Sequence, residues 1–64
     1  MTLRQLERLL AGEKVEIKNG RIFLDGDWFV VEEKVGFNFI TVAGFKNLDV
    51  ALKRLASLTI KERR

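Results

Sequence analysis

Short apolar segments separated by glycine-containing pairs predict a series of short β-strands in the middle of the chain. Charged and apolar residues alternate over 14–18, whereas the segments 22–24, 28–31 and 39–43 are almost continuously apolar. Such alternation is typical of strands with a buried face, and Asn-Gly and Asp-Gly favour two-residue type I′ hairpin turns, in which both loop residues have positive φ. We therefore predict antiparallel strands over 14–18, 21–24, 28–33 and 37–43.

The turns also predict how the strands pair. Turns at Asn19-Gly20 and Asp25-Gly26 place Val15 opposite Leu24, Ile17 opposite Ile22, and Phe23 opposite Trp28. A third turn, at Val35-Gly36, leaves two alternatives, because β-branched Val35 is a poor occupant of a positive-φ position. A four-residue loop over 34–37 keeps the register, with Val31 opposite Ile40 and Phe29 opposite Val42. A three-residue loop would move every side chain of the last strand to the opposite face. We favour the four-residue loop.

In this register the sheet has apolar side chains on both faces. One face is aliphatic, apart from one phenylalanine: Val15, Ile17, Ile22, Leu24, Phe29, Val31, Ile40 and Val42. The other face carries Phe23, Trp28, Val30, Phe39 and Thr41, flanked by Glu16, Lys18, Arg21, Glu32 and Lys34. A half-buried sheet needs only one apolar face, so the aromatic face requires an explanation.

Helical spacing of leucines predicts a helix at each end of the chain. Thr2 and Gln5 form a capping-box pattern, and Gly12 is a suitable stop, which predicts a helix over 2–11. Its apolar stripe is Leu3, Leu6 and Leu10, with Leu9 at the edge.

The second predicted helix follows Asn47, a good N-cap residue. Its apolar stripe is Leu48, Ala51, Leu52, Leu55 and Leu58, and the tail 61–64 is expected to fray. The fold class is therefore α+β, an antiparallel three- to four-stranded β-meander flanked by a short N-terminal and a longer C-terminal helix (α-β-β-β-β-α). We expect one compact domain over residues 1–64.

Composition argues against an enzyme and against a metal site. The 64 residues contain no Cys and no His, and no hydroxyl residue lies in a nucleophile motif. Asp25 and Asp27 flank Gly26 and are read as turn residues. We expect no cofactor, no metal and no membrane partner, and the lack of cysteine favours a cytoplasmic location. The high Glu, Lys and Arg content is compatible with a thermophile.

Three explanations of the aromatic face remain open. The N-terminal helix could pack over it, a second copy could bind there as a homodimer, or bases could stack on it. A net charge of +3 permits a nucleic-acid partner. We predict a small non-enzymatic nucleic-acid-associated regulatory protein. The alternative is a homodimeric protein–protein interaction module, such as a small viral or accessory factor. The predicted phosphate contacts are Lys18, Arg21, Lys34, Lys53, Arg54 and Lys61, and the stacking or interface residues are Phe23, Trp28 and Phe39.

Overall fold

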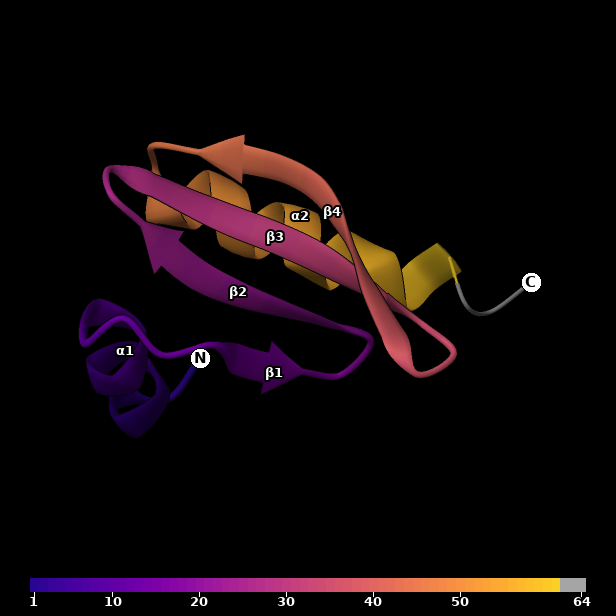
Figure 1. Ribbon diagram of the computed structural model, residues 1–64, viewed down its shortest axis with the longest axis horizontal. Helices are drawn as coiled ribbons and strands as arrows, with labels where there is room; N and C mark the ends of the chain where they lie inside the picture. Colours follow the sequence, from indigo (N-terminus) through magenta and orange to yellow (C-terminus); the bar gives the residue numbers. More distant parts are fainter. Residues whose placement is uncertain (62–64) are drawn as a thin grey trace.

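The predicted α-β-β-β-β-α order is confirmed. The computed structural model describes the backbone of residues 1–61 and the side chains as far as Leu58. Four strands form one antiparallel sheet in the order β1-β2-β3-β4, and in the sequence one helix precedes them and the other follows (Figure 1). The elements are α1 (Leu3–Leu10), β1 (Val15–Ile17), β2 (Gly20–Asp25), β3 (Trp28–Val35), β4 (Asn38–Phe45) and α2 (Leu48–Lys61). Of the tail expected to fray, residues 62–64 lie outside the described part.

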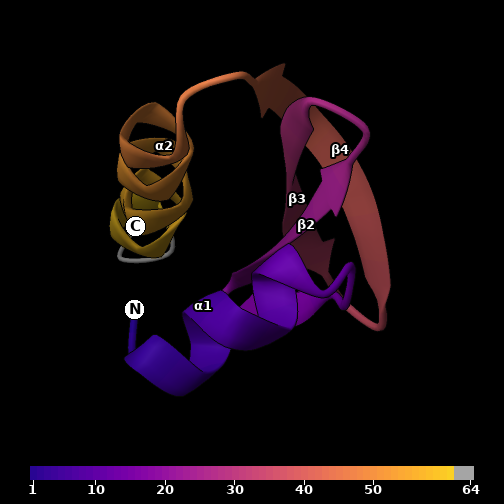
Figure 2. The same ribbon diagram turned by 90° about the vertical axis from the view of Figure 1, so that its left-hand side faces the viewer.

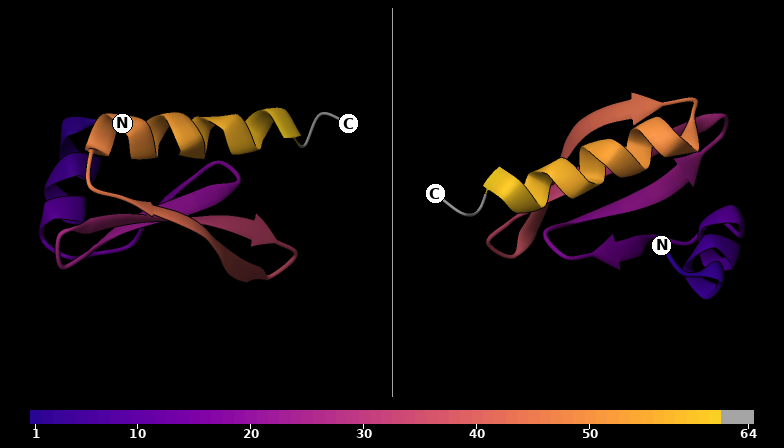
Figure 3. Two further views of the ribbon diagram at one scale, coloured as in Figure 1. Left: turned by 90° about the horizontal axis from the view of Figure 1, so that it is seen from above. Right: turned by 180° about the vertical axis from the view of Figure 1, so that it is seen from behind.

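Both helices lie on the same side of the sheet. Figure 2 shows α1 and α2 together on one side of β2, β3 and β4, and Figure 3 shows α2 running along that side. α2 contacts β2, β3 and β4, whereas α1 contacts β1 and β2 at one end of the layer. The molecule therefore has two layers, and α1 does not cover the aromatic face.

The core lies between the helices and the aliphatic face. Leu9 of α1 is fully buried, whereas Leu3 is 72% and Leu10 is 59% exposed. The predicted apolar stripe of α1 was therefore centred on the wrong residues, because the helix packs against the sheet through Leu6 and Leu9. On α2 the predicted stripe is confirmed. The buried core consists of Leu9, Val15, Ile22, Val31, Ala51, Leu55 and Leu58.

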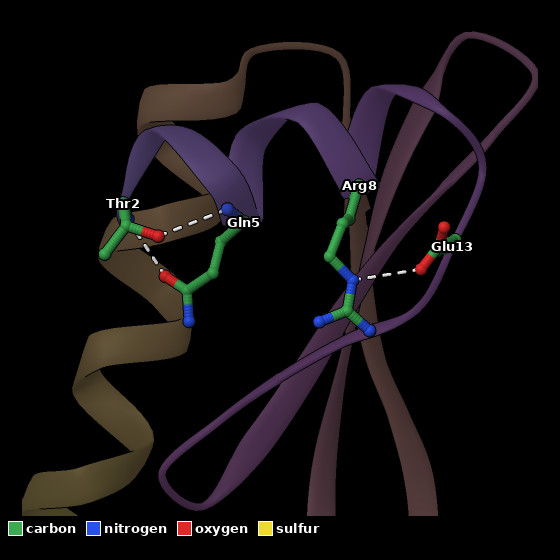
Figure 4. Close-up of polar contacts among 4 residues, drawn as sticks. All are labelled: Thr2, Gln5, Arg8 and Glu13. Carbon is green, nitrogen blue, oxygen red and sulfur yellow. Dashed lines mark hydrogen bonds and ion pairs between the residues drawn. The ribbon is translucent and has the colours of Figure 1, made fainter.

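Side-chain caps fix the starts of both helices. The Thr2 hydroxyl accepts a hydrogen bond from the Gln5 amide at 3.2 Å, and the Thr2 amide donates to Gln5 Oε1 at 2.9 Å (Figure 4). This is the predicted capping box. At the other end of α1, Arg8 Nε donates to Glu13 Oε1 at 3.0 Å, which ties the helix to the following loop. Asn47 Oδ1 accepts from the backbone amides at the start of α2, as expected for an N-cap.

Each predicted hairpin turn lies one position away from its observed place. Val15 pairs with Ile22, and Phe23 pairs with Val30, so both pairings are shifted by two residues from the prediction. The observed loops are 18–19, 26–27 and 36–37. In each loop the first residue alone has positive φ: 53° at Lys18, 61° at Gly26 and 63° at Gly36. This arrangement is that of a type II′ turn, not of the predicted type I′ turn.

Packing against α2 explains why Gly20 belongs to β2 and not to the first turn. A Cβ at this position would lie 2.5 Å from the Glu32 carbonyl oxygen and 2.7 Å from Leu55 Cδ1. Its φ is not positive. The missing side chain therefore lets α2 approach the sheet closely, and the turn uses the two preceding residues instead.

A β-bulge makes the last hairpin irregular. Near its turn β4 pairs regularly with β3, with Glu32 opposite Thr41, but beyond the bulge Val31 lies opposite Ala43. Val42 is the extra residue and still packs against the core. Neither predicted loop length for this hairpin was right. Ile40, which was predicted to lie on the aliphatic face, is 53% exposed, because it lies near the tip of the hairpin.

Candidate binding face

The candidate site is the side of the sheet on which neither helix packs, which we call the open face. It is formed by the alternate residues of β2 and β3 that point away from the core, such as Phe23 and Trp28, and by their neighbours on β4. Phe23, Val30 and Phe39 are half-buried there, and Trp28 is 48% exposed. The sequence correctly placed these aromatic side chains together on one face.

A cationic side chain lies over each of the three aromatic rings. Arg21 Cζ is 3.9 Å from the centroid of the Phe39 ring. Lys14 Nζ lies 5.1 Å from the centroid of Phe23, and Lys46 Nζ lies 5.1 Å from that of Trp28. Such contacts are favourable by about 0.5–1 kcal/mol at exposed sites. The open face is therefore a layer of aromatic rings with positive charges held just above it.

Carboxylates on the same face balance two of its cations. Arg21 Nε donates to Glu32 Oε1, and this pair is half-buried, with 25% of the Arg21 and 12% of the Glu32 side chain exposed. Lys34 Nζ lies 3.3 Å from Glu16 Oε2, and this pair is exposed. Lys14 and Lys46 have no carboxylate partner among the described residues. These two lysines thus lie at Phe23 and Trp28, the rings nearest the strand ends, and the exposed Asp25 lies opposite Trp28 in the β2–β3 ladder.

Trp28 packs against the backbone of β4 at Gly44. A Cβ on Gly44 would be 3.6 Å from Trp28 Cε3, which is ordinary van der Waals contact. Gly44 pairs with Val30, the next residue of β3 on the same face. The indole therefore lies over a glycine of the neighbouring strand and keeps about half of its surface exposed.

The predicted phosphate-binding residues do not form one group. Arg21 and Lys34 lie on the open face, where both are paired with carboxylates, and Lys18 is exposed in the first hairpin turn. Lys53 and Arg54 are exposed on α2, which lies on the other side of the sheet. The side chain of Lys61 lies outside the described part of the chain.

Sequence reasoning missed Lys14 and Lys46 as parts of the site. Lys14 lies two positions before Glu16 and shares its alternation, which was a usable signal. Lys46 directly follows β4, and its position over Trp28 depends on the bulge, which no pattern in the sequence indicates.

Comparison with protein-family models, curated proteins and solved structures gave no match for this chain. Within residues 1–61, neither helix is long and apolar enough to cross a lipid bilayer. Function is therefore inferred from the residues of the open face.

Proposed function

We propose that the protein is a non-enzymatic binding protein for single-stranded nucleic acid and that the open face is its binding surface. The observation that supports this proposal most strongly is the half-exposed Trp28 ring beneath Lys46, on a sheet face that neither helix covers. Aromatic rings on a sheet stack against unpaired bases, and neighbouring cations contact the phosphates. A cytoplasmic location fits a chain without cysteine.

The two kinds of cation on the open face would act differently. Lys14 and Lys46 have flexible stems and form no ion pair with a carboxylate in the described part of the chain, so each can move from its ring to a phosphate when a base stacks there. Arg21 is held between Glu32 and the Phe39 ring. Its planar guanidinium group can itself serve as a stacking surface for a base. In this arrangement Phe39 supports Arg21 and does not contact the base directly.

Single strands are the favoured partner because the rings need accessible base faces. In a duplex the base faces are stacked on each other, so the rings of the open face would have no partner. About three phosphate contacts, by Lys14, Lys18 and Lys46, correspond to a log–log salt slope of about −2 on a single strand. Binding is therefore expected to be weak to moderate and dependent on salt.

The test is a fluorescence titration, because Trp28 is the single tryptophan of the chain. Oligo(dT) should quench its emission at low salt, and a duplex of the same length should quench it much less. The double variant Lys14→Ala/Lys46→Ala should weaken binding about 10-fold, since each lost phosphate contact costs part of the electrostatic free energy. The matched control Lys53→Ala/Arg54→Ala removes the same charge from α2 and should leave open-face binding within about 3-fold of wild type. No quenching by either nucleic acid at low salt, or a larger loss in the control variant, would refute the proposal.

The second candidate function is a protein-interaction module that forms a homodimer through the same face. The exposure of Trp28 favours it, because an exposed indole is common at protein interfaces. In that case Trp28→Arg should turn a dimer into a folded monomer, as measured by sedimentation and circular dichroism on one sample. An unchanged mass for the folded variant excludes this interface.

A further inference from the structure

The outer edge of β4 is long and carries no charge. β4 spans Asn38–Phe45, and among residues 1–61 it has a strand neighbour, β3, on one side only. Its sequence NFITVAGF contains no charged residue and no proline, although 33% of the chain is charged. Edge strands in natural proteins are usually protected by charges, proline or short length, because their free backbone groups can pair with another strand. Apart from the bulge at Val42, β4 lacks these protections.

The opposite edge of the sheet is protected. β1 has only three residues, Val15–Ile17, and Glu16 at its centre is charged and forms an ion pair with Lys34. The two edges therefore differ in both length and charge, and β4 is the edge suited to pairing.

The hydrogen-bond pattern identifies which backbone groups of β4 point outward. The Lys34 amide donates to the Asn19 carbonyl at 2.8 Å, so the backbone groups of Lys34 point toward β2. Lys34 lies opposite Phe39, which is therefore a non-hydrogen-bonded position of the β3–β4 ladder. By alternation Thr41 is another such position. The N–H and C=O groups of Phe39 and Thr41 thus point away from the sheet.

Exposed apolar side chains lie at the same end of β4. Phe37, in the loop before the strand, is fully exposed at 101%. Val35 is 48% and Ile40 is 53% exposed, and both belong to the same hairpin. Pairing along this part of β4 would bring a second strand close to Phe37 and Ile40.

We propose that β4 pairs antiparallel with β4 of a second copy of this chain, along Phe39–Thr41. A two-fold axis near Ile40 places Phe39 of one copy opposite Thr41 of the other, and only Ile40 lies near its own counterpart. Like charges on a charged strand would be brought close together around this axis, but β4 carries none. The exposed Phe37 and Ile40 of each copy then pack against the partner. The four-stranded sheets join into one continuous sheet, and the open faces of the two copies lie side by side.

The test is the solution mass of the full chain without nucleic acid. Sedimentation at about 200 µM should give twice the mass of one chain, because this concentration lies well above a Kd in the micromolar range. Thr41→Pro removes an N–H group that points outward and breaks no hydrogen bond to β3. It should therefore weaken the dimer at least 10-fold and leave the circular dichroism spectrum unchanged from that of wild type. Glu16→Pro is the matched control, because Glu16 has the corresponding outward-pointing position on the β1 edge. It should remain a dimer.

A monomeric wild type at this concentration would overturn the proposal, as would a dimeric Thr41→Pro or a monomeric, folded Glu16→Pro. If Thr41→Pro does not fold, Thr41→Lys replaces it, since the Thr41 side chain is exposed and two lysines would repel each other across the axis. A dimeric Thr41→Lys then counts against the proposal. Trp28→Arg should not change the mass, which separates this dimer from one formed through the open face.

Discussion

The two faces of the sheet differ in what their apolar side chains do. On the covered face, Ile22 and Val31 are fully buried beneath α2. On the open face, the neighbouring residues Phe23 and Val30 are only half-buried, and the rings there lie beneath lysine and arginine side chains. Adjacent residues of one strand thus serve different purposes. The covered face supplies most of the free energy of folding, and the open face keeps accessible aromatic surface next to positive charge.

The sharpest test of this difference compares two adjacent residues of β2. Ile22→Ala should lower the free energy of unfolding by about 2–5 kcal/mol, because it leaves a cavity in the core. Phe23→Ala should cost less, about 1 kcal/mol, since its ring is only half-buried and removes less surface from water. Urea denaturation of both variants checks the comparison. Equal losses of stability would contradict the assignment of the core to one face.

The close approach of α2 to the covered face is tested at Gly20. Gly20→Ala should destabilise the fold by about 1–3 kcal/mol, because the new methyl group meets a backbone carbonyl that has little room to move. Gly44→Ala, at an ordinary contact distance from Trp28 on the open face, is the matched control and should cost less. Thermal melts of the two variants suffice. A tolerated Gly20→Ala would mean that α2 lies further from the sheet.

The smallest expected effect concerns the first hairpin turn. Lys18 has a φ of 53° without being glycine, whereas Gly26 and Gly36 occupy the same position of the other two turns. Lys18→Gly should therefore stabilise the protein by about 0.5–1 kcal/mol, because glycine adopts this conformation without strain. A small rise in melting temperature is the expected result. A fall would indicate that Lys18 has a stabilising contact in the turn.

The sequence predicted the faces of the first two hairpins although it misplaced their turns. Both pairings were shifted by two residues, and a shift by an even number leaves each side chain on its face. Val15 and Ile22 therefore belong to the core as predicted, although each was given the wrong partner. The hydrophobic pattern determined the faces more strongly than the turn residues determined the register.

Features that depend on packing between distant segments could not be predicted. Gly20 resembles a turn residue until α2 is in place, and only then does its missing side chain matter. The face of α1 that packs against the sheet contains either Leu9 or Leu10, and at helical spacing each choice completes a leucine stripe. The bulge at Val42 has no local signal, since the residue before it and the residue after it are equally compatible with a regular strand.

The candidate site was predicted in part. Phe23, Trp28 and Phe39 share one face, because alternation within strands is enough to place them there. The cations were assigned less well, since the predicted set combined residues of the open face with Lys53 and Arg54 of α2, which packs on the other face. The structure separates them from the open face.

The most direct test of the binding proposal is a nuclear magnetic resonance titration of the labelled protein with a short single-stranded oligonucleotide at low salt. Backbone and side-chain resonances of the open face, above all the Trp28 indole and its neighbours on β2 and β4, should shift progressively. Resonances of Lys53 and Arg54 on α2 should stay in place and serve as the internal control. Shifts concentrated on α2, or none at saturating oligonucleotide, would contradict the assignment of the open face as the binding surface.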